Sequence, residues 1–367
     1  MSGRNPRKRV EALLAEADVR VGGGRPWDLH VHDERFFRRV LAEGSMGLGE
    51  SYMDGWWDSP RVDDLVARVL RAGLARRLVT PTDLLAVLRA RIFNLQKLSR
   101  AFEIGHHHYD LGNDLYERML DPRMVYSCGY WRGVETLAGA QEAKLDLVCR
   151  KLELAPGMRV LDVGCGWGGA AAFAAERYGV EVVGVTVSEA QVRWARRRWK
   201  GLPVEFRLED YRRLGEHTDG DARFDRIFSL GMFEHVGHRN HRIFMKVVRR
   251  HLAPDGIFLL HTIGRNRTSA GTDPWIARYI FPNSMIPSAR QITRAAEGSF
   301  VLEDWHSFGA DYDRTLLAWH CNVDGAWNEV RRRYGERFER MWRYYLLSCA
   351  GSFRARQNQL WQIVLTP

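Results

Sequence analysis

A stretch of apolar residues that runs into a glycine-rich turn restricts the fold of this chain more than any other feature. Residues 159–169 read RVLDVGCGWGG, with four glycines in the last six positions. Val160, Leu161 and Val163 favour a β-strand, and the alanine-rich stretch after Gly168 favours a helix. Glycines in such a turn let a ligand approach the backbone closely. The stretch therefore predicts an α/β fold with a ligand-binding turn, although a glycine turn alone occurs in many α/β domains.

Strand-like and helix-like segments alternate on both sides of this turn. Strands are predicted at 158–163, 180–186, 203–208, 226–231 and 257–263, and helices at 139–152, 168–178, 188–200 and 239–252. Such alternation predicts a doubly wound parallel sheet, whose ligands lie beyond the carboxyl ends of the strands. The loops that follow the five strands should therefore surround one site.

Length and cysteine usage suggest a two-domain protein of a reducing compartment. The chain has 367 residues, a length for which two domains are expected. We expect residues 1–95 to form a smaller domain, 96–104 a linker and 105–367 the α/β domain. The five cysteines form no C-x-x-C pair, which argues against a zinc site and a disulfide framework. No apolar run approaches the ~18 residues that span a bilayer, so we expect a cytoplasmic protein without a metal site.

The net charge of +10 predicts an anionic partner, either an acidic membrane surface or a nucleic acid. Residues 71–100 contain seven Lys or Arg and a single Asp. Apolar residues recur there with helical spacing at Leu84, Leu88, Ile92 and Leu95. A basic amphipathic helix of this kind lies on a membrane surface, or packs its apolar face on its own domain. The arginines expected to face an anionic leaflet are Arg76, Arg77, Arg89 and Arg91.

Polar side chains stand at the ends of the first three predicted strands. Asp162 precedes the glycine turn, and its carboxylate suits a ligand that carries a cation, such as a sulfonium or its amino group. Asp210 ends the third strand, where its carboxylate and the ring of Tyr211 suit an adenine. Thr186 ends the second strand, in place of the acid that usually binds ribose hydroxyls. Gln191 is the expected substitute.

A glutamate and a histidine follow the next two strands. Glu234 lies in GMFEHVG (231–237), and His261 lies in LLHTIG. Neighbouring strand ends bring such a pair within hydrogen-bonding reach, as general acid–base catalysis requires. Alternatively, His261 is a buried residue that satisfies a backbone carbonyl. His235 is expected to face outward, and the histidine run at 106–108 is too remote in sequence to complete a metal site.

Several long motifs resemble, in order, those of the cyclopropane-fatty-acyl-phospholipid synthases. They read YSCGYW (126–131), VLDVGCGWGG, VGVTVS, GMFEHVG, LLHTIG and FGADYDRT (308–315). The resemblance extends to HYDLGNDLY (108–116), GLGESYMDGWW and CAGSFRARQNQLWQ (349–362), so it covers nearly the whole chain. It implies a Rossmann-like methyltransferase domain with a smaller N-terminal mixed α/β domain for lipid docking. It also implies a homodimer that uses S-adenosylmethionine to add a methylene across a cis double bond of a phospholipid acyl chain.

The resemblance also assigns residues to a cofactor site and a base pocket. The cofactor would be held by Tyr126, Ser127, Gly164, Gly166, Thr186, Val187, Gln191, Asp210 and Gly231, to which the strand ends add Asp162, Glu209 and Tyr211. The pocket in which such enzymes hold bicarbonate would be formed by Cys128, Glu234, His261, Ile263 and Tyr312. There the bicarbonate hydroxyl would donate to Glu234, and His261 with the N–H groups of Cys128 and Ile263 would hold its other oxygens. Cys349 matches a cysteine once considered a nucleophile, but its helical surroundings predict a packing residue.

The chemistry explains why such a site must be dry. Methyl transfer to an alkene leaves a carbocation, which must avoid water and lose a proton to close the ring. Aromatic faces stabilise cations, and the candidates are Trp131, Tyr279, Phe281, Phe308 and Tyr312.

Three other functions remain open at this level. A nucleic-acid methyltransferase would explain the run RWARRRWK (193–200), which more simply forms an exposed helix face. A catalytically silent lipid-binding protein would not need Glu234, His261 and Tyr312 together. A relative could also methylate without ring closure, or act on another lipid carrier.

Overall fold

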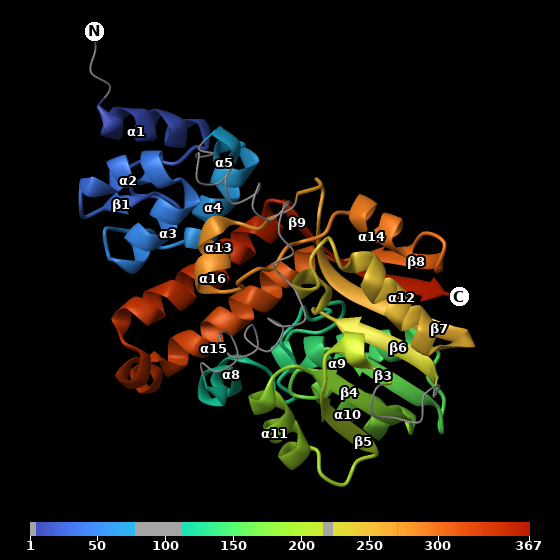
Figure 1. Cartoon of the computed structure of the whole chain (residues 1–367). Helices are drawn as coiled ribbons and strands as arrows, with labels where there is room; N and C mark the ends of the chain where they lie inside the picture. Colours follow the sequence, from blue (N-terminus) through green and yellow to red (C-terminus); the bar gives the residue numbers. More distant parts are fainter. Residues whose placement is uncertain (1–4, 78–111, 216–222, 270) are drawn as a thin grey trace. The chain divides into compact units, whose positions relative to one another are not determined.

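The computed structural model describes residues 5–77, 112–215, 223–269 and 271–367 (Figure 1). The chain divides into two compact units. Unit 1 comprises Met1–Phe93, Ala270–Pro282 and Tyr312–Asn358, and unit 2 comprises Asn94–Ser269, Asn283–Asp311 and Gln359–Pro367. This division differs from the contiguous one predicted, because α13 (Pro274–Tyr279) and α16 (Glu336–Arg354) pack with the N-terminal helices. The predicted linker at 96–104 lies outside the described residues.

The described part of unit 2 is built around a sheet with the strand order β5-β4-β3-β6-β7-β9-β8. Its strands are β3 (Arg159–Val163), β4 (Glu181–Thr186), β5 (Val204–Leu208), β6 (Phe224–Leu230), β7 (Leu252–Arg265), β8 (Val301–Ser307) and β9 (Asn358–Thr366). Strands β3 to β7 pair in parallel, and β8 is antiparallel to β9. The predicted parallel sheet is confirmed, whereas β8 and β9 were not predicted.

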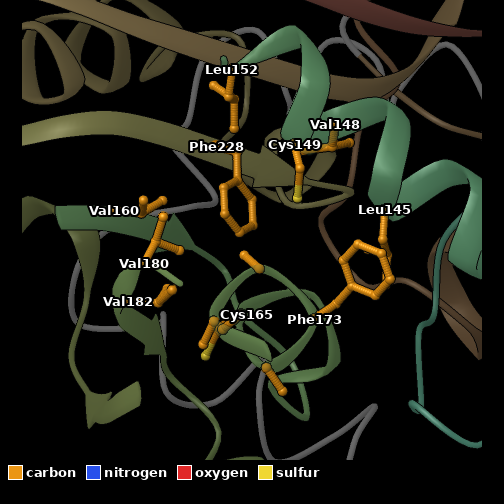
Figure 2. Close-up of a cluster of buried hydrophobic side chains, with 14 of the residues drawn as sticks. Leu145, Val148, Cys149, Leu152, Val160, Cys165, Phe173, Val180, Val182 and Phe228 are labelled. Atoms are coloured by element: carbon orange, nitrogen blue, oxygen red, sulfur yellow. The ribbon is translucent and has the colours of Figure 1, made fainter. Parts of the chain in front are cut away.

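Helices cover both faces of this sheet (Figure 1). One face packs against α9 (Leu137–Lys151), α10 (Gly169–Tyr178) and α11 (Glu189–Arg198), and the other against η2 (Tyr211–Arg213), η3 (Phe233–His235), α12 (His241–His251) and α14 (Ala289–Ala296). Figure 2 shows part of the first cluster, in which Leu152, directly after α9, lies over Phe228 of the sheet and Leu145 of α9 lies beside Phe173 of α10. The two buried clusters make the sheet a rigid platform for the loops at its edge.

The strand order reverses between β3 and its neighbour β6. The chain proceeds outward from β3 to β4 and β5 on one side, and from β6 to β7 on the other. At such a reversal the loops diverge and leave a crevice at the carboxyl ends of the strands. The glycine-rich turn after β3 therefore stands at the point where doubly wound sheets bind their ligands.

Unit 1 is mainly helical in its described part. Its elements are α1 (Pro6–Glu16), β1 (His30–Val31), α2 (Arg35–Glu43), α3 (Ser45–Met53), β2 (Trp57–Asp58), α4 (Val62–Arg71), α5 (Leu74–Arg77), α13 (Pro274–Tyr279), most of α15 (Ala310–Tyr334) and α16 (Glu336–Arg354). Helix α16 lies close against α4, since a Cβ added to Gly351 would stand 2.5 Å from the carbonyl oxygen of Asp63. The sheet of this unit is the antiparallel pair of β1 and β2.

Arg354, near the end of α16, holds three carboxylates of unit 1. It pairs with Asp63 at 2.7 Å, with Asp313 at 2.9 Å and with Asp64. Asp63 is 1% exposed and also pairs with Arg61. Burial alone would raise the pKa of Asp63, but the hydrogen bonds from Arg61 and Arg354 hold it below its ordinary value. Arg354 therefore links α4, α15 and α16.

Most of the predicted docking segment lies outside the described residues. Helix α5 is described as far as Arg77, an exposed residue that pairs with Glu16 at 2.7 Å. Arg89, Arg91 and the side chain of Arg76 are not described. In the ranges that the structure does describe, every helix is too short or too polar to cross a bilayer.

Candidate active site

A single pocket at the carboxyl end of the parallel strands collects all of the residues predicted to hold the cofactor. It is lined by Tyr126, Ser127, Asp162, Gly164, Gly166, Thr186, Val187, Gln191, Glu209, Asp210, Tyr211 and Gly231. These residues come from the segment before α9, from the ends of β3, β4, β5 and β6, and from the starts of α11 and η2. Sequence-distant residues thus meet where the strand order reverses.

The glycine-rich turn leaves space for a ligand on the pocket side. Gly166 has a φ of +55°, and the nearest atom to an added Cβ would be Nε2 of Gln191, 4.0 Å away. Gly164 has a φ of +88°, and its added Cβ would collide with Met232 at 2.7 Å. The turn needs glycine for its backbone at both positions, and at Gly166 the absent side chain also opens the pocket.

Asp162 is a buried carboxylate that faces this pocket. It is 2% exposed, and its Oδ2 has no hydrogen-bond partner among the described residues. Burial raises its pKa to about 8, although the positive charge of Lys144 opposes the shift. A buried carboxylate oxygen without a partner is unfavourable unless a ligand supplies a donor or a positive charge.

Thr186 and Gln191 form one hydrogen-bonded unit beside the turn. The Thr186 hydroxyl donates to Oε1 of Gln191 at 2.9 Å, and Ser188 caps α11 by accepting from the N–H of Gln191. Because Oε1 of Gln191 accepts from Thr186, its amide nitrogen is directed toward Gly166. The pair can therefore offer an N–H donor to a hydroxyl group of a ligand.

Asp210 has a partner, Arg212, that was not predicted. It caps η2 by accepting from the Arg212 N–H at 2.9 Å, and both of its carboxylate oxygens accept from the guanidinium at 2.8 Å. The Tyr211 ring packs edge-on against Phe244 at 5.2 Å, and burial raises its pKa. Glu209 is 8% exposed, and its N–H donates to the Thr186 carbonyl at 2.9 Å. Arg212 thus fixes the carboxylate that was predicted to face adenine.

Two residues of α9 hold the segment that contains Ser127, and neither was predicted. The Gln141 amide donates to the Ser127 carbonyl at 2.7 Å, and the Lys144 ammonium donates to the Ser127 hydroxyl at 3.0 Å. Both side chains are fully buried. The signal was present in the sequence, since Gln141, Lys144, Leu145 and Val148 share one face at helical spacing.

Glu234 lies in η3 directly after β6, and His261 lies within β7 beside the end of β6. Oε1 of Glu234 accepts from the Ile263 N–H at 2.6 Å, and His261 pairs with Leu230 in the sheet. Oε2 of Glu234 and Nε2 of His261 have no hydrogen-bond partner in the described ranges. The Ile263 N–H, predicted to hold bicarbonate, is therefore engaged by Glu234 in this structure.

The surroundings of these two residues favour a Glu234 carboxylate that can accept a proton and a His261 imidazole that stays neutral. Burial raises the pKa of Glu234 to about 7, and the Ile263 N–H opposes the shift. Burial, together with the charges of Lys144 and Lys151, holds the pKa of His261 well below its ordinary value. The ring of Phe308 stands edge-on to His261 at 5.9 Å. Glu234 can therefore gain or lose a proton near neutral pH, whereas His261 stays uncharged.

The remaining predicted residues differ in what surrounds them. Cys128 is fully buried, and its thiol donates to the Gly129 carbonyl at 3.2 Å. Tyr312 belongs to unit 1, where its ring contacts Trp319 and Phe353. Burial raises the pKa of Cys349 to about 12, which makes its thiol a poor nucleophile near neutral pH.

His235 does not face outward as predicted. It lines the cofactor pocket, and burial lowers its pKa to about 4. The reason is that η3 turns immediately after β6 and directs this side chain back toward the strand ends. Among the described residues, His, Cys, Asp and Glu form no group suited to a metal ion.

Comparison with known proteins gives concordant matches. A model of the mycolic acid cyclopropane synthetase family matches residues 96–363. A cyclopropane-fatty-acyl-phospholipid synthase of Escherichia coli (strain K12) is 54% identical over 355 residues, which cover 96% of this chain and 91% of the relative. A probable fatty acid methyltransferase of Pseudomonas putida is 37% identical over 269 residues, covering 70% of this chain and 67% of the relative.

A solved structure adds a likeness in three dimensions. A mycolic acid cyclopropane synthase complexed with SAH and CTAB is 31% identical, has a TM-score of 0.66, and covers 72% of this chain and 98% of that chain. The extent of these matches, together with the sheet and the pocket described above, shows that this chain is an enzyme of the mycolic acid cyclopropane synthetase family.

Proposed function

We propose that the enzyme transfers a methylene from S-adenosylmethionine across the cis double bond of unsaturated acyl chains in membrane phospholipids. Bicarbonate would accept the proton that is lost on ring closure. The observation that carries the proposal is the pair of buried, unpartnered atoms, Oε2 of Glu234 and Nε2 of His261, beside the end of β6. The name of the Escherichia coli relative supports the substrate class.

The pocket residues fit the cofactor in chemical type. S-adenosylmethionine, when bound, supplies an electrophilic methyl group on a sulfonium. Asp162 would stabilise its positive charges, Gln191 would donate to a ribose hydroxyl, and Asp210 would accept from the adenine amino group. The relative solved with SAH supports a site for this class of ligand.

The base pocket fits a small oxyanion that carries a hydroxyl group. Glu234 would accept the hydrogen bond of that hydroxyl, and His261 would donate to another oxygen through a neutral ring. The Cys128 N–H is the remaining predicted donor. The edge-on Phe308 ring helps to exclude water from this part of unit 2. The role of Tyr312 stays a prediction from the resemblance.

Replacing Asp210 with Ala should weaken cofactor binding. The variant loses a charge-assisted hydrogen bond, so the binding free energy should fall by about 1.5–3 kcal/mol. It also removes one partner of the Arg212 guanidinium, a residue that lines the same pocket. Asp210→Asn is the matched control, because it keeps the oxygen that caps η2 but removes the charge. Calorimetry that gives the parent affinity for Asp210→Ala would contradict the assignment of Asp210 to adenine.

Lipid analysis tests the reaction itself. Mass spectrometry of phospholipids from cells that express the enzyme should show monounsaturated species that have gained one CH2. A ring-diagnostic method then separates cyclopropane from branched methyl products. The likeness to a probable fatty acid methyltransferase makes methylation without ring closure the second candidate, and a branched product would favour it. Unmodified lipids would reject both functions.

We also propose that the basic segment at 71–100 docks on the anionic leaflet. Changing Arg76, Arg77, Arg89 and Arg91 together to Glu should abolish sedimentation with anionic vesicles and leave cofactor affinity intact. The attraction should fade with salt, because exposed charges are screened over ~8–10 Å. Since Arg77 already pairs with Glu16, Glu16→Gln is a control that should strengthen vesicle binding slightly. Equal, salt-insensitive binding by the quadruple variant and the parent would reject the segment as the docking surface.

The proposal keeps a homodimer, which the resemblance implies. The mass of the purified enzyme in solution measures it directly.

A further inference from the structure

Lys144 is a buried cation that the proposed reaction does not yet use. It stands on the inner face of α9, and its side chain is 0% exposed. Lys144 donates to the Ser127 hydroxyl at 3.0 Å and forms no ion pair with a described residue. No other Lys or Arg in the described ranges is buried. Removing an ammonium from water is costly unless its charge is compensated, so this position requires an explanation.

The charge of Lys144 reaches groups on both sides of the Ser127 segment. It interacts with the carboxyl groups of Asp121, from the segment before α9, and of Asp162 on β3. It also lowers the pKa of His261 on β7. Burial lowers the pKa of Lys144 itself to about 8, with Asp121 opposing the shift. Lys144 thus lies within electrostatic range of both the cofactor pocket and the base pocket.

The proposed base pocket needs a positive charge that its predicted members do not supply. An anion bound beside Glu234 would be repelled by the negative carboxylate of that residue. The imidazole of His261 is uncharged and does not offset this repulsion. Like charges in a buried site repel strongly because little water screens them. Binding of an anionic base there therefore requires a nearby fixed cation.

We propose that Lys144 is the positioning residue of the base pocket, which fixes the Ser127–Cys128 segment by its hydrogen bond and supplies the positive charge that retains an anionic base beside Glu234 and His261. The inference rests on the proposed function, since it assumes that the base is bicarbonate. Lys144 does not touch the reacting atoms in this account; it acts through Ser127 and through its charge.

A purely structural role makes a different prediction, which a matched pair of variants can separate. Lys144→Met keeps the length of the apolar stem and removes the charge. Gln141→Met removes the neighbouring bond to the Ser127 carbonyl, from the same helix and without a change of charge. If Lys144 only supported the segment, both variants should behave alike.

The experiment measures initial rates of the full-length enzyme against added bicarbonate in degassed buffer. Lys144→Met should require roughly tenfold more bicarbonate or more for its half-maximal rate, as expected for a lost buried charge. Gln141→Met should differ from the parent by less than about threefold in this quantity. Cofactor affinity by calorimetry should fall to a similar extent in the two variants, because each loses one bond to Ser127, which lines the cofactor pocket. Lys144→Arg, which keeps the charge, should restore part of the bicarbonate affinity.

The outcomes distinguish this inference from the proposed function. A parent that responds to bicarbonate and a Lys144→Met variant with the same half-saturation would overturn the role of Lys144 alone. A parent with no response to bicarbonate would overturn both the role of Lys144 and the assignment of bicarbonate as the base, whereas methylene transfer itself is tested separately by the lipid product. If Lys144→Met does not fold, Lys144→Gln is used instead, because it keeps a donor to Ser127 without the charge. The bicarbonate concentration for its half-maximal rate then tests the role of Lys144 in the same way.

Discussion

Glu234→Gln should lose most of its turnover, on the order of 10²–10⁴-fold, the contribution of a positioned acid or base. The amide can still accept the hydrogen bond from the Ile263 N–H. Its NH2 group, however, would face the oxyanion in place of Oε2, and it cannot take up a proton. Cofactor affinity, measured by calorimetry, should be unchanged because Glu234 does not line the cofactor pocket.

The same residue should set a pH dependence. Because Glu234 must be ionised to accept a hydrogen bond from the base, activity should fall as the pH is lowered through about 7. Its pKa is raised from 4.5 to about 7 on folding, so the folded chain binds this proton more tightly than the unfolded chain. The associated stability is present below pH 4.5 and is lost as the pH rises through 7. Glu234→Gln should remove this dependence and unfold less readily than the parent above pH 7.

The control for this variant is Glu142→Gln, which removes a charge from a partly exposed ion pair of Arg123. It should keep parental turnover and the parental pH profile. Full activity of Glu234→Gln in bicarbonate-free buffer would show that another group takes the proton. Activity restored to Glu234→Gln by bicarbonate alone would show that its carboxylate is dispensable.

Arg354→Met should lower the free energy of unfolding by about 3 kcal/mol, the scale for breaking a buried ion pair at one partner. The variant leaves Asp63, which is 1% exposed, with Arg61 as its remaining cation. Asp313 loses its guanidinium partner on α15 at the same time. Chemical denaturation followed by circular dichroism measures the change.

Arg61→Met is the matched control, since it removes the other partner of Asp63. The Arg61 side chain is 48% exposed, and exposed pairs contribute about 0–1 kcal/mol. A similar loss of stability in the two variants would show that Arg354 stabilises Asp63 no more than Arg61 does. If Arg354→Met is as stable as the parent, the three carboxylates tolerate one another without it.

The sequence predicts well the half of the sheet whose strand ends line the cofactor pocket, because local, repeating sequence signals mark each of its strands. Strands such as β3 and β4 begin within one residue of the predicted positions, since apolar β-formers and the glycine turn mark their ends. Strand β7 starts earlier than predicted, at Leu252, because Leu252 pairs with Phe224 across an irregularity in the register. Such pairing depends on a distant strand and leaves no local signal.

Non-local packing explains the other differences. The sequences of α13 and α16 are those of ordinary amphipathic helices. No local pattern in them indicates that they pack with the N-terminal helices. Lys144 reads as one cation on a mixed helix, and only the tertiary structure shows that it is buried. Likewise, the pairing of Arg212 with Asp210 and of Glu234 with the Ile263 N–H depends on side-chain geometry that spacing alone does not fix.

The placement of β9 between β7 and β8 has a consequence for biosynthesis. Strand β7 is synthesised roughly 90 residues before its neighbour β9. At about 5–20 residues per second, the backbone groups on that edge of β7 remain unpaired for ~5–20 s. Strand β8 is translated during this interval but has no partner until β9 follows. Helices α3 and α4 wait even longer for α16. The nascent chain therefore exposes unpaired, aggregation-prone strand edges until late in translation. The yield of folded enzyme should depend on chaperones and on the speed of elongation over roughly the last hundred codons.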